Sequence, residues 1–160
     1  MAVTQNSVIV RSFTDVWEDG TFAHTSSSSE VIYPGYLVYQ YSGGITTGDP
    51  AALPTYRVNA DINYPPVIVY ENDLIGETID DDIASGDYIR VKFLAPGEKY
   101  VVYGQSTTAI AVGALLSPHT DGKVIAHSGP GNNAQTLFRA ETAVAADATD
   151  TRLVVRVLRV

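Results

Sequence analysis

The feature that most constrains this chain is a series of short segments in which apolar and polar residues alternate. In "DYIRVKF", Ile89, Val91 and Phe93 alternate with more polar side chains. Successive side chains of a strand point to opposite faces, so this period of two is typical of a strand with one buried face. Similar segments are "GYLVYQY", "PTYRVN", "PPVIVYE", "KYVVY", "TLFRAE" and "RLVVRVLRV". Together they predict a protein made mainly of strands.

Glycine and proline mark turns between these segments. Pro96 and Gly97 suit a type II turn, because proline presets the first φ and glycine accepts the positive one. We therefore expect residues 88–93 and 99–103 to pair as a hairpin. The Asp-Gly pair in "HTDGKVIAH" is typical of a type I′ hairpin turn. Such punctuation indicates a sandwich or closed barrel, and "TIDDDIA" is expected to add one helical turn capped by Thr78.

The first 33 residues differ from the rest of the chain. They combine the strand-like "NSVIVRSF" with the flexible polar run "TSSSS". We expect residues 1–33 to form an N-terminal arm or added strand that pairs outside its own domain, and residues 34–160 to form a β-barrel domain. An edge strand of the same sheet is the alternative for the early segment, and both readings stay open at this point.

Charge is distributed unevenly along the chain, whose net charge is −8. Residues 1–89 hold two arginines against thirteen acidic residues, a net charge of −11, whereas residues 90–160 have a net charge of +3. No run of lysine and arginine stands out, so we expect neither nucleic acid nor an anionic membrane as a partner. No apolar run reaches the ~20 residues of a membrane-spanning helix, and no signal peptide is recognisable, so we expect a soluble protein made in the cytoplasm.

The stretch "YENDLIGETIDDDIASGD" holds seven carboxylates and is the strongest candidate for chemistry. It fits a catalytic carboxylate pair, a calcium site formed by Asp80, Asp81, Asp82 and Asp87, or an exposed connector. Neighbouring acids on one loop are usually all ionised, and the spacing of an EF-hand loop is absent. The connector is favoured, so no metal, cofactor or catalytic site is predicted here.

Other catalytic arrangements have little support. The chain has no cysteine and no G-x-S-x-G motif, and its three histidines, His24, His119 and His127, lack a defined third zinc ligand. His119 and His127 flank the Asp-Gly turn and are placed to meet across it. These observations predict that the protein is not an enzyme and uses no cofactor.

Tyrosine is unusually frequent, with ten residues against four phenylalanines and one tryptophan. Tyrosine favours interfaces because its ring packs while its hydroxyl group forms hydrogen bonds, although it also simply fits strands. The candidate interface aromatics are Tyr33, Tyr36, Tyr39 and Tyr41.

Four quoted segments occur in an order that resembles a known family. "YPGYLVYQY" is followed by "VIVYENDLIGETIDDDIASGDYIRVKFLAPGEKYVVYG", then "TTAIAVGALLSPHTDGKVIAH" and "FRAETAVAADATDTRLVVRVL". This set is similar to the small capsid decoration, or cement, proteins of tailed bacteriophages and related head-tail viruses. The resemblance covers about residues 34–158 and implies a compact all-β domain, a β-barrel or β-tulip-like fold with an extended N-terminal arm.

The resemblance also implies a function. The chain would be a non-enzymatic virion structural protein that binds the outer capsid surface as a homotrimer and stabilises the major capsid protein lattice, after synthesis in the host cytoplasm. Its capsid-binding arm would contain Val8, Ile9, Val10, Arg11 and Phe13. The alternative is a host-surface or glycan-binding β module displayed on the virion, which would use exposed tyrosines and the Ser26–Ser29 loop.

Overall fold

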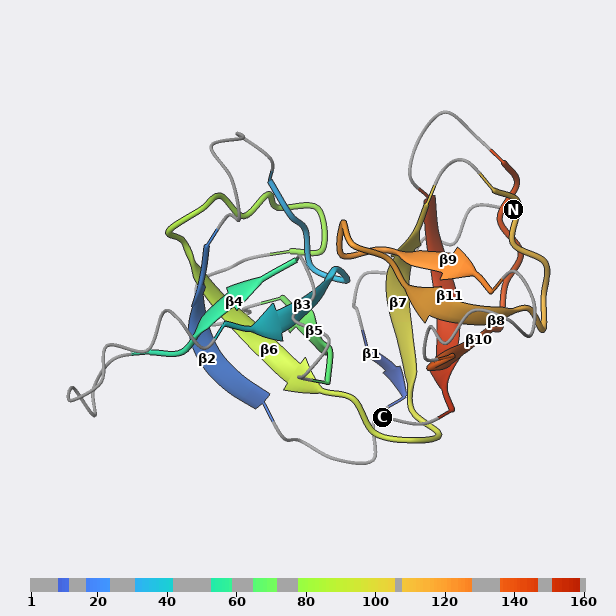
Figure 1. Ribbon diagram of the computed structural model, residues 1–160, viewed down its shortest axis with the longest axis horizontal. Helices are drawn as coiled ribbons and strands as arrows, with labels where there is room; N and C mark the ends of the chain where they lie inside the picture. Colours follow the sequence, from blue (N-terminus) through green and yellow to red (C-terminus); the bar gives the residue numbers. More distant parts are fainter. Residues whose placement is uncertain are drawn as a thin grey trace.

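The computed structural model describes residues 9–11, 17–23, 31–41, 53–58, 65–71, 78–105, 108–127, 136–146 and 151–158 (Figure 1). These residues form strands and connections but no helix, so the described part of the chain holds no membrane-spanning helix either. The prediction of an all-β protein is confirmed. The eleven strands are β1 (Ile9–Arg11), β2 (Trp17–Phe22), β3 (Leu37–Gln40), β4 (Thr55–Arg57), β5 (Val67–Tyr70), β6 (Tyr88–Phe93), β7 (Lys99–Gly104), β8 (Leu115–Pro118), β9 (Val124–Ala126), β10 (Phe138–Ala140) and β11 (Thr151–Val157).

Five strands from the first half of the chain close into a barrel, which we call the first ring. Their order is β2-β4-β3-β5-β6, and β6 returns to β2. Strand β2 runs parallel to β4, and the other pairings are antiparallel. As the alternation predicts, Ile89 and Val91 of β6 are buried and pack with Val38, Val69 and other apolar side chains inside this ring. The alternation fails at the end of the strand, where Lys92 is buried and Phe93 is exposed.

The last five strands and β1, from near the start of the chain, form a six-stranded sheet in the order β1-β7-β11-β10-β8-β9. Strand β9 also pairs with β7, where Gly104 lies opposite Val124, so β7 to β11 form a second ring. Strand β1 lies beside the other half of β7, with Ile9 opposite Tyr100 and Arg11 opposite Lys99. The prediction of a barrel is therefore confirmed, but the chain forms two such rings side by side (Figure 1).

Both described strands of residues 1–33 pair within the chain. Strand β2 belongs to the first ring, and Ile9–Arg11 forms β1 beside the second ring. Of the residues proposed for the capsid-binding arm, Val8 and Phe13 lie outside the described residues, as does the Ser26–Ser29 loop. A boundary at residue 33 and a capsid-binding role for the arm stay predictions.

The predicted hairpin between residues 88–93 and 99–103 is wrong, although both strands exist. Strand β6 pairs with β2 and β5, whereas β7 pairs with β1, β9 and β11. The turn at Pro96 and Gly97 is present, and Gly97 has a φ of 90°. This turn carries the chain from one ring into the other, and the Gly97 N–H donates to the carbonyl of Val157 in the second ring.

The hairpin around Asp121 and Gly122 is confirmed, because β8 and β9 pair antiparallel with Pro118 opposite Val124. The type I′ turn is wrong. That turn needs a positive φ at two central residues, and among the described residues only glycines have one, including Gly122 at 81°.

The tip of this hairpin joins the two rings. The Leu37 N–H of the first ring donates to the Gly122 carbonyl over 2.7 Å. A Cβ added to Gly122 would lie 2.9 Å from the Leu37 carbonyl oxygen, 2.9 Å from Tyr36 and 3.0 Å from Val58. Only glycine fits here, because the backbones of the two rings are in direct contact.

Aromatic and apolar side chains extend this junction. Leu37 and Ile68 of the first ring pack in the core of the second ring, and Tyr103 of the second ring packs in the core of the first. The Tyr103 ring lies 4.9 Å from the Tyr36 ring and 6.1 Å from the Tyr33 ring, measured between centroids. Each ring therefore has its own hydrophobic core and contributes side chains to the core of the other.

A buried polar cluster lies where the chain crosses between the rings. Lys92 Nζ of β6 lies 3.8 Å from Glu98 Oε1, and the two side chains are 1% and 0% exposed. The Tyr100 hydroxyl of β7 donates to the same carboxylate. Buried charges are costly unless they are paired and hydrogen-bonded, so this cluster fixes the geometry of the crossing.

Candidate protein-binding face

Cationic residues occupy matching positions on three adjacent strands of the second ring. The register places Lys99 of β7 opposite Arg156 of β11, and Arg156 opposite Arg139 of β10. Residues directly opposite each other on neighbouring strands lie on the same face of a sheet. We call Lys99, Arg156 and Arg139 the cationic row.

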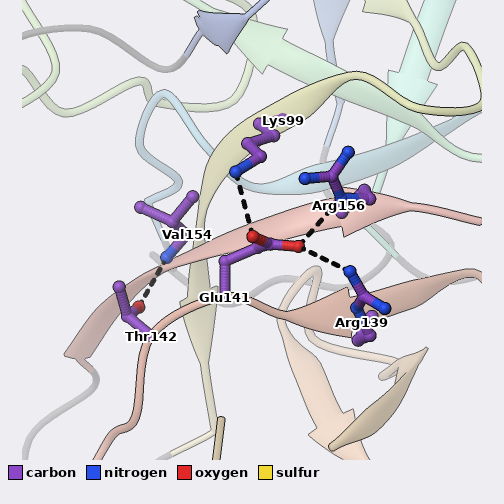
Figure 2. A network of polar contacts seen from close by, with 6 residues as sticks. All are labelled: Lys99, Arg139, Glu141, Thr142, Val154 and Arg156. Atoms are coloured by element: carbon purple, nitrogen blue, oxygen red, sulfur yellow. Dashed lines mark hydrogen bonds and ion pairs between the residues drawn. The ribbon is translucent and has the colours of Figure 1, made fainter. Parts of the chain in front are cut away.

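One carboxylate lies among these cations. Glu141 accepts from Arg156 Nε at 2.8 Å, from Lys99 Nζ at 2.9 Å and from Arg139 Nη2 at 3.1 Å (Figure 2). The hydrogen bonds from Arg156, Lys99 and Arg139 favour the ionised form and lower the pKa of Glu141 to about 2. Glu141 is therefore ionised at any physiological pH.

The backbone fixes the position of Glu141. It follows β10, and its N–H donates to the Val154 carbonyl of β11 over 2.8 Å. The next residue, Thr142, accepts from the Val154 N–H through its hydroxyl oxygen at 2.9 Å (Figure 2). These bonds continue the β10–β11 pairing past the end of the strand, which holds the carboxylate over the row.

Glu141 does not balance the charge of the row. Three cationic side chains contact its single carboxylate, and none of them is fully buried. The side chains of Lys99, Arg156 and Arg139 are 25%, 31% and 46% exposed. Like charges placed directly opposite on neighbouring strands destabilise a sheet. The cationic row is present despite this repulsion, and it gives the sheet an exposed face with excess positive charge.

Exposed apolar side chains continue this face. Leu115 of β8 lies opposite Arg139 and is 48% exposed, and Val112 on the preceding turn is 65% exposed. A Cβ added to Gly113 between them would meet nothing within 4 Å. Arginine beside exposed apolar groups is a typical composition of protein–protein interfaces.

The acidic stretch packs against both rings, with Ile83 in the core of the first ring and Ile79 in the core of the second. We call residues 78–87 the acidic loop; residues 72–77 of the predicted stretch lie outside the described residues. Asp80 binds Arg152 Nη2 at 2.6 Å, and the same nitrogen donates to the Ile79 carbonyl at 2.8 Å. Asp81 accepts from the Thr78 N–H at 2.5 Å and Asp87 from the Ala84 N–H at 2.7 Å.

These contacts are those of a connector. The Thr78 hydroxyl accepts from the Asp80 N–H at 3.3 Å, so Thr78 caps a turn, but the turn is not the predicted helical one. Asp80, Asp81, Asp82 and Asp87 are exposed. No group of three or more potential metal-ligating residues occurs in the part of the chain that the structure describes.

The candidate interface tyrosines are mostly internal. Tyr36 and Tyr39 are buried, and burial raises the pKa of Tyr39 to about 12. Tyr33 is half-buried against Tyr36, and the Tyr41 ring stacks under the Arg57 guanidinium at 3.4 Å. Their use in an interface stays a prediction, and little of Tyr36 or Tyr39 is left for a partner.

The two described histidines bind different neighbours. His119 Nδ1 lies 2.7 Å from Asp121 Oδ1, and His127 Nδ1 lies 3.2 Å from the Ser117 hydroxyl. Burial alone would raise the pKa of Asp121, but the hydrogen bond with His119 and the charge of Lys123 together outweigh it and lower the pKa. His24 lies outside the described residues.

Sequence reasoning missed the cationic row. Its members, Lys99, Arg139 and Arg156, are far apart in the chain, so they do not form a run of basic residues that the sequence alone would show. The available signal was the alternation in "FRA" and "TRLVVRV", which places each arginine on the outer face of its strand. Only the register between strands shows that these positions meet.

The chain is similar to solved structures, among them the one described as "The crystal structure of head fiber gp8.5 N base in bacteriophage phi29". The TM-score to that chain is 0.44 and the sequence identity 16%, and the match covers 91% of this chain and 100% of that chain. No protein-family model matches the chain, and no curated protein does either.

Proposed function

We propose that this chain is a non-enzymatic structural protein of a virion, which binds the outer surface of a capsid as a homotrimer and stabilises the major capsid protein lattice. The order of the four sequence segments supports this function, and so does the all-β fold. Two rings that insert side chains into each other's cores and contact each other through their backbones form a stiff body. A clamp between neighbouring capsid subunits needs such stiffness.

The observation that carries the proposal is the exposed face formed by the cationic row with Leu115 and Val112. It combines arginines, a lysine and apolar side chains at the surface of a rigid sheet. Interface hot spots are enriched in arginine, and a structural protein works through such faces rather than through a cleft. Trimer avidity would turn modest single contacts into lasting attachment to a repetitive shell.

The N-terminal segment is the proposed contact with the capsid. Strand β1 has three residues, and its register shifts between Ile9 and Arg11. Residues 8–13 would extend a strand of the major capsid protein by main-chain hydrogen bonds, which depend little on side-chain identity. The exposed face formed by the cationic row, Leu115 and Val112 would then make the remaining contacts of the two rings with their partners.

The experiment is a binding assay on the capsids of the virus that encodes the chain. Purified protein is added to heads that lack it, and bound copies are counted after sedimentation. We expect saturable binding, a fixed number of copies per head and a higher temperature of DNA release. A variant lacking residues 1–13 should lose most of this binding. Absence of saturable binding by the full chain would refute the proposed function.

A further inference from the structure

We propose that the cationic row of one copy binds the acidic loop of a second copy, so that the chain associates with itself head to tail. This inference rests on the proposed function, because it names the contact that would hold the homotrimer together. Within the described residues of one copy no ion pair joins the acidic loop to the row: Asp80 binds Arg152 of β11, and the row binds Glu141.

The arginines of the cationic row carry more N–H donors than their contacts with Glu141 use. A guanidinium carries five N–H donors, and within the described residues Arg139 and Arg156 each contact Glu141 through one nitrogen. Glu141 supplies one negative charge against the three cations that bind it. A docked carboxylate would therefore find both unused donors and an uncompensated positive charge, and charge-assisted hydrogen bonds are about twice as strong as neutral ones.

The aspartates of the acidic loop offer more acceptor sites than their contacts within the loop use. A carboxylate offers about four acceptor sites on its two oxygens. Asp81 and Asp87 each use one oxygen to accept a backbone N–H of their own loop. Asp82 is exposed and forms no side-chain hydrogen bond or ion pair among the described residues. These contacts shape the loop and leave most of its negative charge facing solvent.

Charge complementarity selects a second copy as the occupant. Residues 1–89 have a net charge of −11 and residues 90–160 a net charge of +3, so each copy carries both halves of a complementary pair. A contact between two different surfaces is heterologous, and it closes into a ring when the rotation between copies allows. Leu115 and Val112 beside the row would add buried apolar area to each contact.

The contact should respond strongly to salt. The Debye length falls from ~10 Å at 0.1 M salt to ~3 Å at 1 M. Pairs formed between exposed side chains are then largely screened, while apolar contacts strengthen or stay unchanged. Self-association should weaken by roughly tenfold or more over this range, which separates the proposed contact from a purely hydrophobic one.

The test is sedimentation velocity of the full chain over a concentration series at 50 mM and 1 M NaCl. We expect Arg139→Glu and Asp82→Lys each to weaken self-association about tenfold or more at low salt. The double variant, which exchanges the two charges, should recover most of the wild-type affinity. Thr120→Glu, an exposed change on the second ring outside the row, is the matched control and should leave affinity unchanged.

Three outcomes would overturn the inference: a wild-type chain that is monomeric at 100 μM in low salt, single variants that behave like Thr120→Glu, or a double variant weaker than both singles. Melting temperatures of all variants must match within a few degrees, which excludes misfolding as the cause. If wild-type protein still saturates undecorated heads while these results are negative, this inference fails and the proposed function stands. Failure of head binding alone refutes only the proposed function.

Discussion

Gly122 gives the sharpest test of how the two rings are joined. Its φ of 81° disfavours any residue with a Cβ, which costs about 1–2 kcal/mol in this region. A Cβ would also lie 2.9 Å from the Leu37 carbonyl oxygen and from Tyr36. Relief of this clash stretches the 2.7 Å hydrogen bond from the Leu37 N–H, which contributes about 0.5–1.5 kcal/mol. Gly122→Ala should therefore lower the free energy of unfolding by about 2–4 kcal/mol.

Gly113→Ala is the matched control, because Gly113 has a φ of 84° and no atom within 4 Å of the added Cβ. It should cost only the backbone contribution of about 1–2 kcal/mol. For a chain of this size 1 kcal/mol corresponds to roughly 2–4 °C in Tm, so calorimetry should show a drop at least about twice as large for Gly122→Ala. Equal drops for the two variants would mean that the hairpin tip does not join the rings.

The remaining predictions concern charged groups. Glu141→Gln should lower Tm at low salt, because three cations lose their shared carboxylate, and the loss should shrink in 1 M NaCl. The pKa of Glu141, about 2, lies below its usual value. The contribution of ionised Glu141 to the free energy of unfolding is therefore complete above about pH 4.5 and disappears toward pH 2. In acid titrations followed by circular dichroism, wild type and Glu141→Gln should unfold alike at pH 2. Lys92→Met should lower the free energy of unfolding in urea by about 3–5 kcal/mol, because it removes the positive charge beside the buried carboxylate of Glu98. The double variant Lys92→Met, Glu98→Gln should recover part of that loss.

Local patterns in the sequence predict strands well and pairings poorly. The alternation over residues 88–93 coincides with β6, and residues 99–103 lie within β7. The turn at Pro96 and Gly97 is also real, yet the strands on either side of it belong to different rings. Turn chemistry determines how the chain bends but not which strand lies alongside. Strand β7 pairs along its whole length with β11, which is far away in the sequence.

The candidate site shows the same limit. The prediction that the acidic stretch is a connector agrees with the capped turn at Thr78 and with the exposed aspartates, since those contacts are local in the chain. The cationic row depends on register between strands separated by up to 57 residues along the chain, such as Lys99 and Arg156. No local pattern contains that information, so only the folded chain brings these charges together.

The path of the chain between the rings has a consequence for synthesis. Strand β1 is made before the other described strands, yet its partner β7 begins at Lys99, after the whole of the first ring. On a ribosome the first ring can close once β6 has emerged, while β1 must wait without its partner until β7 follows. Strand β1 is therefore paired later than the first ring, and it remains available to another chain throughout that interval.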